Sequence, residues 1–164
     1  MGGNSLSSAS NPDEWVLHPS PVWGDRVDVV ANTTFDDSGP GTLRFEQLLF
    51  EKLDDQRFRL CCIPFFTSGY SLGDVVALKD DQEIGVSPGE VVERSDHWSL
   101  RVLVTPDGDA AALQELLTTH GAEVETRGHL VACSVVGREQ LRSFRRGLDE
   151  LEHGGHLVYE TAWI

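Results

Sequence analysis

Hydrophobic positions in the C-terminal part of the chain recur with two different periods, which distinguishes strands from helices. They recur at every second position over residues 100–104, whereas over residues 113–117 and 141–151 they recur at helical spacing. Asp109 is a suitable N-cap for the first helix, and glycines at positions 121 and 154–155 end the two helices. Residues 122–127, 130–136 and 157–163 are predicted to be strands. The pattern therefore predicts the order βαββαβ over residues 100–164.

This order, with two right-handed crossovers, predicts a ferredoxin-like module in which two helices cover one face of a four-stranded antiparallel sheet. The other face of the sheet must be covered as well. We expect either the N-terminal part of the chain or a second copy, in a homodimer through the sheet face, to cover it.

Short strands separated by turns are predicted over residues 41–99. The predicted strands are 44–52, 58–62, 75–78 and 90–94. This spacing indicates a small β-barrel-like module or a curled sheet. Gly73-Asp74 resembles the turn of small barrels in which Gly allows a tight bend and Asp binds backbone amides.

Residues 1–40 show only a weak strand signal at 27–31 and are predicted to be a partly disordered leader. The predicted fold class is α+β, with boundaries at 1–40, 41–99 and 100–164.

The net charge of −14 excludes the function classes that need a positive surface. Nucleic acid and anionic membranes are therefore not expected as partners. Acidic residues are densest in residues 61–99, which carry seven acidic and two basic side chains. This excess suits a basic protein partner, and general solubility is the alternative explanation. Three cysteines make no disulfide framework, and no apolar run approaches the roughly 18 residues of a membrane span, so we expect a cytoplasmic protein.

The densest group of polar side chains bridges the two predicted modules. The candidate ligand- or partner-binding residues are Arg94, Ser95, Asp96, His97 and Trp98, together with Asp74. Arg94 and His97 could bind an anion or move a proton in a cleft between the modules. The alternative is a polar joint in which the charged groups hydrogen-bond to one another.

The sequence predicts no catalytic residue, metal site or cofactor. His153 and His156 stand three residues apart but straddle a helix stop, without a cysteine or carboxylate at ligand spacing. A glycine-rich phosphate loop and a nucleophile motif are also lacking. Cys133 lies within a predicted strand and is interpreted as a structural thiol.

Four segments carry a resemblance to a known family: Ile63-Pro64-Phe65-Phe66, Gly73-Asp74-Val75-Val76, Val91 to Ser95 followed by His97, and Leu100-Arg101-Val102. In this order and spacing, residues 44–164 resemble a bacterial family catalogued as domain of unknown function 4265. The chain departs from it at Asp96, where the family tends to have Gly, and at Trp98, where it tends to have a small residue. The family has no established activity, so the resemblance supports the fold and leaves the function open.

These observations favour a non-catalytic protein-binding protein, in its most concrete form an immunity or antitoxin-like protein that binds a basic toxin or effector. The alternatives are a small-ligand sensor, an enzyme that acts on an anionic substrate at the joint around Arg94 and His97, and a structural accessory subunit.

Overall fold

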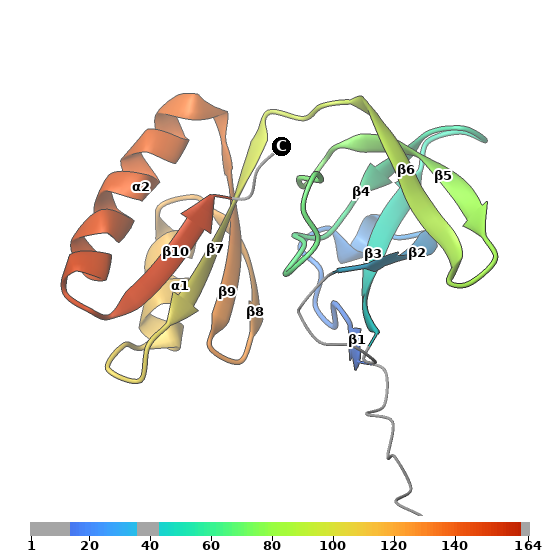
Figure 1. The fold of residues 1–164 in the computed structure, drawn as a ribbon. Helices are drawn as coiled ribbons and strands as arrows, with labels where there is room; N and C mark the ends of the chain where they lie inside the picture. Colours follow the sequence, from blue (N-terminus) through green and yellow to red (C-terminus); the bar gives the residue numbers. More distant parts are fainter. Residues whose placement is uncertain (1–13, 36–42, 162–164) are drawn as a thin grey trace, which may run out of the picture.

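The computed structural model describes residues 14–35 and 43–161. The first 13 residues of the predicted leader and the end of the predicted last strand at 162–163 lie outside the described residues, as do residues 36–42. The described residues form two sheets, two α-helices and one short 3-10 helix, which is a mixed α+β architecture (Figure 1).

The first sheet is built from the N-terminal strands. These are β1 (Glu14–Val16), β2 (Val29–Thr34), β3 (Arg44–Lys52), β4 (Phe58–Leu60), β5 (Val75–Asp81) and β6 (Gly85–Glu93), with the 3-10 helix η1 (Gly24–Arg26) between β1 and β2. The second half follows the predicted order. Its elements are β7 (His97–Val104), α1 (Ala110–Thr119), β8 (Glu123–Arg127), β9 (Leu130–Val136), α2 (Gly137–His153) and β10 (Leu157–Thr161).

The second sheet is antiparallel throughout, with strand order β10-β7-β9-β8. Both helices cover the face that points away from the first sheet (Figure 1). Every second side chain of β7 enters the core on that face, where it meets the buried leucines of α1 and α2. Asp109 caps α1 by accepting a hydrogen bond from the backbone N–H of Ala112 at 3.0 Å.

The first sheet is curled, but its described strands do not form a closed barrel. The order is β1-β3-β4-β5-β6, and β2 pairs with the other side of β3. The edge strands β2 and β6 approach each other without a backbone ladder between them. The Asn32 side-chain amide instead donates to the carbonyl of Ile84, which precedes β6, at 2.8 Å. Of the two predicted arrangements, a small β-barrel-like module or a curled sheet, the described strands form a curled sheet.

β1 and β2 come from the segment predicted to be a leader. β1 pairs in parallel with the start of β3, and β2 pairs antiparallel with the same strand over six residues. Neither segment has a strong pattern of its own, since β1 has three residues and prolines follow it. The nine-residue strand β3 supplies partners for both, so residues 14–16 and 29–34 belong to the first sheet.

The loop between β4 and β5 covers the open face of the second sheet. Ile63, Phe65 and Leu72 of this loop are buried in one cluster with Val16 of β1 and Ala132 of β9. The N-terminal part of the chain thus covers that face of the second sheet, which is one of the two arrangements expected. The connection between the sheets is short, because β6 ends at Glu93 and β7 begins at His97. None of the described helices is both long enough and apolar enough to span a membrane.

Candidate functional site

Asp74 is the centre of the joint between the two sheets. Its buried carboxylate accepts hydrogen bonds from the backbone N–H groups of Ser71, at 2.9 Å, and Ser95, at 2.8 Å. The preceding Gly73 has a φ of +84°, and a Cβ there would lie 3.2 Å from side-chain atoms of Ser95 and Trp23. Gly73 is therefore required both for the backbone conformation and for the close approach of these side chains.

Arg94 and His97 each have a partner within the protein. Arg94 Nη1 donates to Asp74 Oδ2 at 2.9 Å and to the Gly69 carbonyl at 2.8 Å. His97 Nδ1 lies 3.0 Å from Ser134 Oγ, and its ring meets Trp23 edge to face at 5.4 Å. Burial lowers the pKa of His97, so this imidazole is neutral at pH 7.

Asp96 and Trp98 do not join this group. The Asp96 carbonyl accepts the backbone N–H of Gly137 at 2.8 Å, which fixes the start of α2, while the Asp96 side chain is exposed. Trp98 packs against the core on the helix-covered face, and the Arg138 guanidinium lies 5.7 Å from its ring centroid. The structure therefore brings together four of the six predicted candidates, namely Asp74, Arg94, Ser95 and His97.

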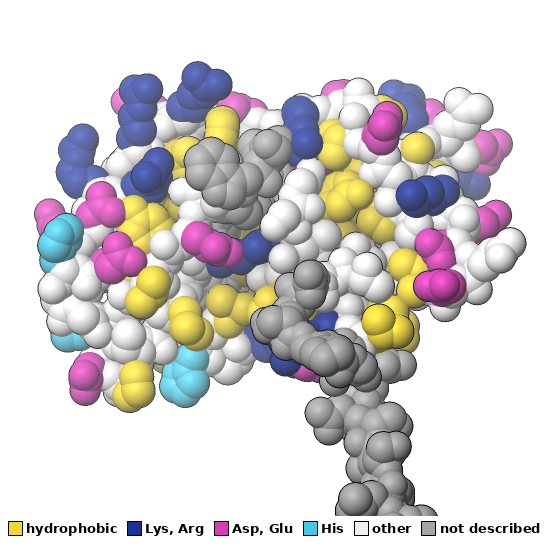
Figure 2. All heavy atoms as spheres, viewed as in Figure 1, with side chains coloured by type: hydrophobic (Ala, Val, Ile, Leu, Met, Phe, Trp, Pro, Cys, Tyr) yellow, Lys and Arg dark blue, Asp and Glu magenta, His cyan; other side chains and the backbone are white. Residues whose placement is uncertain are grey.

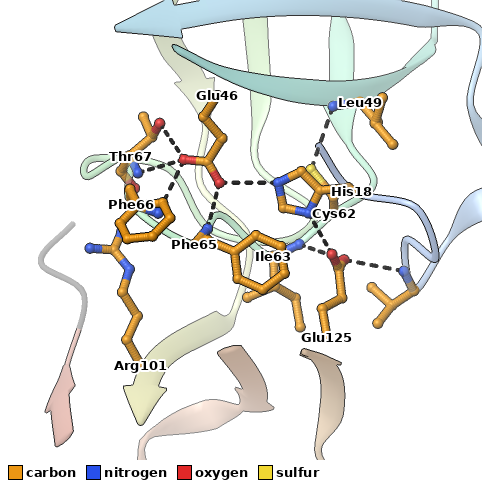
Figure 3. A network of polar contacts seen from close by, with 11 residues as sticks. His18, Glu46, Leu49, Cys62, Ile63, Phe65, Phe66, Thr67, Arg101 and Glu125 are labelled. Carbon is orange, nitrogen blue, oxygen red and sulfur yellow. Dashed lines mark hydrogen bonds and ion pairs between the residues drawn. The ribbon is translucent and has the colours of Figure 1, made fainter. Parts of the chain in front are cut away.

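A second polar cluster lies deeper between the sheets. It consists of His18, Glu46 of β3 and Glu125 of β8, which are all buried, and is called the buried network below. His18 Nε2 lies 3.0 Å from Glu46 Oε1, and His18 Nδ1 lies 2.5 Å from Glu125 Oε2. Figure 3 shows the imidazole between the two carboxylates. Because Glu125 comes from the second sheet, this histidine links the two halves of the molecule.

The two carboxylates also satisfy the backbone of the buried loop that follows β4. Glu46 accepts hydrogen bonds from the N–H groups of Phe65, Phe66 and Thr67 and from the Thr67 hydroxyl (Figure 3). Glu125 Oε1 accepts the N–H groups of Ile63 at 2.8 Å and Val22 at 3.3 Å. A buried loop has no strand partner for its amides, and an unpaired buried N–H is costly. The carboxylates take the place of that partner.

His18 carries a positive charge in this environment. Burial by itself would lower the pKa of His18, but contacts with Cys62, Glu125 and Glu46 outweigh burial and raise it to about 12. Burial likewise acts to raise the pKa of Glu46, yet hydrogen bonds from His18 and Thr67 bring it below its ordinary value. Burial raises the pKa of the Cys62 thiol, which therefore stays protonated. The buried network is an imidazolium between two carboxylates.

This arrangement is suited to holding the sheets together rather than to catalysis. Both imidazole nitrogens are occupied by carboxylates, so His18 has no position from which to take a proton from Cys62 or from a substrate. Cys62 is itself fully buried. The carboxylates stand on opposite sides of the ring, so their oxygens do not converge on one point. Within the described residues, no group of three or more His, Cys, Asp or Glu side chains could hold a metal ion.

Sequence reasoning did not identify the buried network. A signal for Glu46 exists, since it shares the apolar face of β3 with Leu48 and Phe50 at every second position. Glu125 gives no such signal, because it alternates with Val124 as an ordinary exposed residue would. Its burial results from the first sheet, which covers that face of β8.

Comparisons with known proteins place the chain in a family but give no activity. The profile of the family described as "Domain of unknown function (DUF4265)" matches residues 46–159, and the chain belongs to this family. A search of curated proteins finds no match. A solved structure described as a hypothetical protein from Neisseria gonorrhoeae is similar, with a TM-score of 0.67 and 17% identity over 83% of this chain and 96% of that chain. At this identity the likeness is one of fold alone.

Proposed function

We propose that this protein is a non-catalytic binding protein that recognises a basic protein through the acidic hairpin, defined as β5, β6 and their turn (residues 75–93). The concrete form of the proposal is an immunity or antitoxin-like protein that covers the basic surface of a toxin or effector in the cytoplasm. The observation that carries it is the excess of negative charge on this hairpin.

The acidic hairpin carries five acidic side chains and one basic side chain, Lys79. The acidic residues are Asp80, Asp81, Glu83, Glu90 and Glu93. Among the described residues, none of these five carboxylates forms an ion pair. Acidic side chains are visible in Figure 2 along the edge of the molecule where Figure 1 places β5 and β6. Such a field speeds the encounter with a positively charged partner.

A partly apolar groove lies beside these charges and supplies a second element of an interface. It has a volume of about 500 Å³ and is lined by the apolar residues Phe58, Ala77, Leu78 and Val92 and by the polar side chains of Asp55, Gln56 and Arg57. The Val92 side chain is 57% exposed. Interfaces commonly combine an apolar anchor with a charged rim, and this groove could receive an apolar side chain of the basic partner.

The alternative of an enzyme at the joint is less well supported. Arg94 and His97 are engaged by Asp74, the Gly69 carbonyl and Ser134, so substrate binding would have to break these hydrogen bonds. A structural role accounts for the same contacts.

We also propose that the second half is a ferredoxin-like module and the first a barrel-like one, because the strand order β10-β7-β9-β8 and the curl of the first sheet support these assignments.

The test uses two matched sets of substitutions in the full chain, each of which removes four negative charges. The hairpin set is Asp80→Asn, Glu83→Gln, Glu90→Gln and Glu93→Gln. The control set lies on exposed positions of the second half and is Asp107→Asn, Glu115→Gln, Glu139→Gln and Glu150→Gln. Asp81 is kept, because its carboxylate accepts the backbone N–H groups of Glu83 and Ile84 and holds the turn.

Proteins captured from a lysate of the native host by the immobilised wild type are identified, produced separately and titrated against all three forms. We expect a basic protein that binds wild type and control set alike and binds the hairpin set at least about tenfold more weakly. A partner that binds all three forms equally would contradict the proposal, as would capture of no protein beyond those that bind an unrelated acidic protein.

A further inference from the structure

A cavity between the sheets is lined by the charged side chain of Arg101, which belongs to neither the joint nor the acidic hairpin. It has a volume of about 580 Å³, within the range of small-molecule sites. Its apolar wall is formed by Phe35, Phe65, Phe66, Leu103, Leu130 and Val158. Leu103 and Val158 are paired neighbours on β7 and β10, and both are more than half exposed. Figure 2 shows apolar side chains gathered where this end of the second sheet meets the first sheet.

Arg101 of β7 is the cation of this cavity. Its side chain is only 9% exposed, and it points from the second sheet towards Thr67 and Phe66 (Figure 3). Nη2 donates to the Thr67 carbonyl, and Nη1 lies 3.2 Å from Glu160 Oε1. Nε is buried and has no hydrogen-bond partner among the residues that the structure describes. A buried guanidinium has five N–H donors, and an unmade hydrogen bond to a charged group is costly.

Glu160 is a weak internal partner for this guanidinium. Its side chain is 65% exposed, so water competes for the carboxylate and the pair contributes little. The Phe35 and Phe66 rings are stacked with their centroids 4.7 Å apart, which provides flat apolar surface near the Arg101 guanidinium. A ligand with one carboxylate and an aromatic body would pair with Arg101 and cover these rings.

We propose that this cavity binds a small aromatic carboxylate, with the Arg101 guanidinium as its anchor and Glu160 as an internal competitor that the ligand displaces. This site is separate from the acidic hairpin and goes beyond the proposed function. No bond is made or broken in the ligand, since the proposal concerns binding alone.

The experiment titrates the full chain by calorimetry with 2-naphthoate, and with 2-naphthamide as the uncharged ligand of the same shape. We expect 2-naphthoate to bind at least about tenfold more tightly than 2-naphthamide, as a charge-assisted hydrogen bond requires. In Arg101→Met this preference is lost.

Two variants at exposed positions test the site without depending on the stability of Arg101→Met. Glu160→Gln removes the competitor and is expected to strengthen 2-naphthoate binding by about threefold or more. Leu103→Glu places a negative charge on the wall and is expected to abolish binding. The hairpin set should bind 2-naphthoate as wild type does, which separates failure of this site from failure of the proposed function.

Two results would overturn the inference. The first is equal affinity for acid and amide, or no binding of either ligand. The second is unchanged 2-naphthoate affinity in both Glu160→Gln and Leu103→Glu.

Discussion

At the scale of single residues, Glu46 has the most demanding position in the molecule. It is fully buried, and its two oxygens accept five hydrogen bonds, from His18, Phe65, Phe66 and both donors of Thr67. A carboxylate so placed is stable only because each lone pair has a donor. Removal of its charge would leave several donors unpaired at once.

Glu46→Gln is therefore predicted to lower the free energy of unfolding by about 3–5 kcal/mol, the usual cost of breaking a buried ion pair. Glu51→Gln on the same strand is the matched control. Glu51 pairs with Arg59 at 3.3 Å in a partly exposed position, and its loss should cost less than about 1 kcal/mol. Urea unfolding of the two variants measures both values. Equal losses would show that the buried network does not contribute as described.

The charge of His18 predicts a pH dependence of stability. Its pKa is raised from 6.5 to about 12, so its contribution is complete below pH 6.5 and is lost as the pH rises towards 12. The pKa of Glu46 is lowered from 4.5, so its contribution is lost as the pH falls below 4.5. The difference in unfolding free energy between wild type and His18→Gln should therefore be largest between pH 4.5 and 6.5.

Above pH 6.5 this difference should shrink by about 1.4 kcal/mol per pH unit. The pKa of His97 is lowered, so His97 gives the unfolding free energy an opposite pH dependence. That dependence is the same in wild type and in His18→Gln, and it cancels when the two unfolding free energies are subtracted. Urea unfolding at a series of pH values tests the prediction. A difference that grows with pH would show that His18 is neutral in the folded protein.

Residue positions in the joint could be found from the sequence, and those in the buried network could not. Asp74, Arg94, Ser95 and His97 lie in short polar segments next to predicted strands, and local patterns identify them. His18, Glu46 and Glu125 are 28 or more positions apart. Only the packing of one sheet against the other brings them together, and no periodicity in the chain encodes that contact.

At the scale of elements, the strands of the second sheet and both helices agree closely with the sequence pattern. Residues 130–136 form β9 as predicted, and α1 begins after its predicted cap. Strong periodicity and glycine stops determine these bounds. The differences concern β1 and β2, whose pairing is provided by β3, and the bounds of four further strands. β4 ends at Leu60 rather than at residue 62, and β5 extends three residues beyond its predicted end into the acidic hairpin. β6 begins at Gly85, five residues before its predicted start, and β7 begins at His97, three residues before its predicted start.

The turn before β5 depends on Gly73, and its replacement tests that element. Gly73→Ala meets both an unfavourable positive φ and side-chain atoms at 3.2 Å. Gly85→Ala has the same φ of +84° but nothing within 4 Å of the new Cβ. We predict that Gly85→Ala costs about 1–2 kcal/mol, the conformational term alone, and that Gly73→Ala costs clearly more. Equal losses in thermal or urea unfolding would contradict the tight packing of the joint.

At the scale of the whole molecule, the two sheets are expected to unfold as one unit. Glu125 links His18, Ile63 and Val22 of the first half to β8 of the second, and one apolar cluster contains residues of both halves. Glu125→Gln should therefore uncouple the halves. In wild type, hydrogen exchange should give β3 and β9 the same free energy of opening, whereas in Glu125→Gln the two values should separate. Values that stay equal in the variant would argue against this link.

Binding of a basic protein by the acidic hairpin should be visible in the salt dependence of the complex. Exposed charges are screened beyond about 8 Å at physiological ionic strength. The association constant of the recovered partner should therefore fall steeply with salt for wild type and the control set, and much less steeply for the hairpin set. The same salt dependence in all three forms would place the interface elsewhere on the molecule and rule out the acidic hairpin as the binding surface.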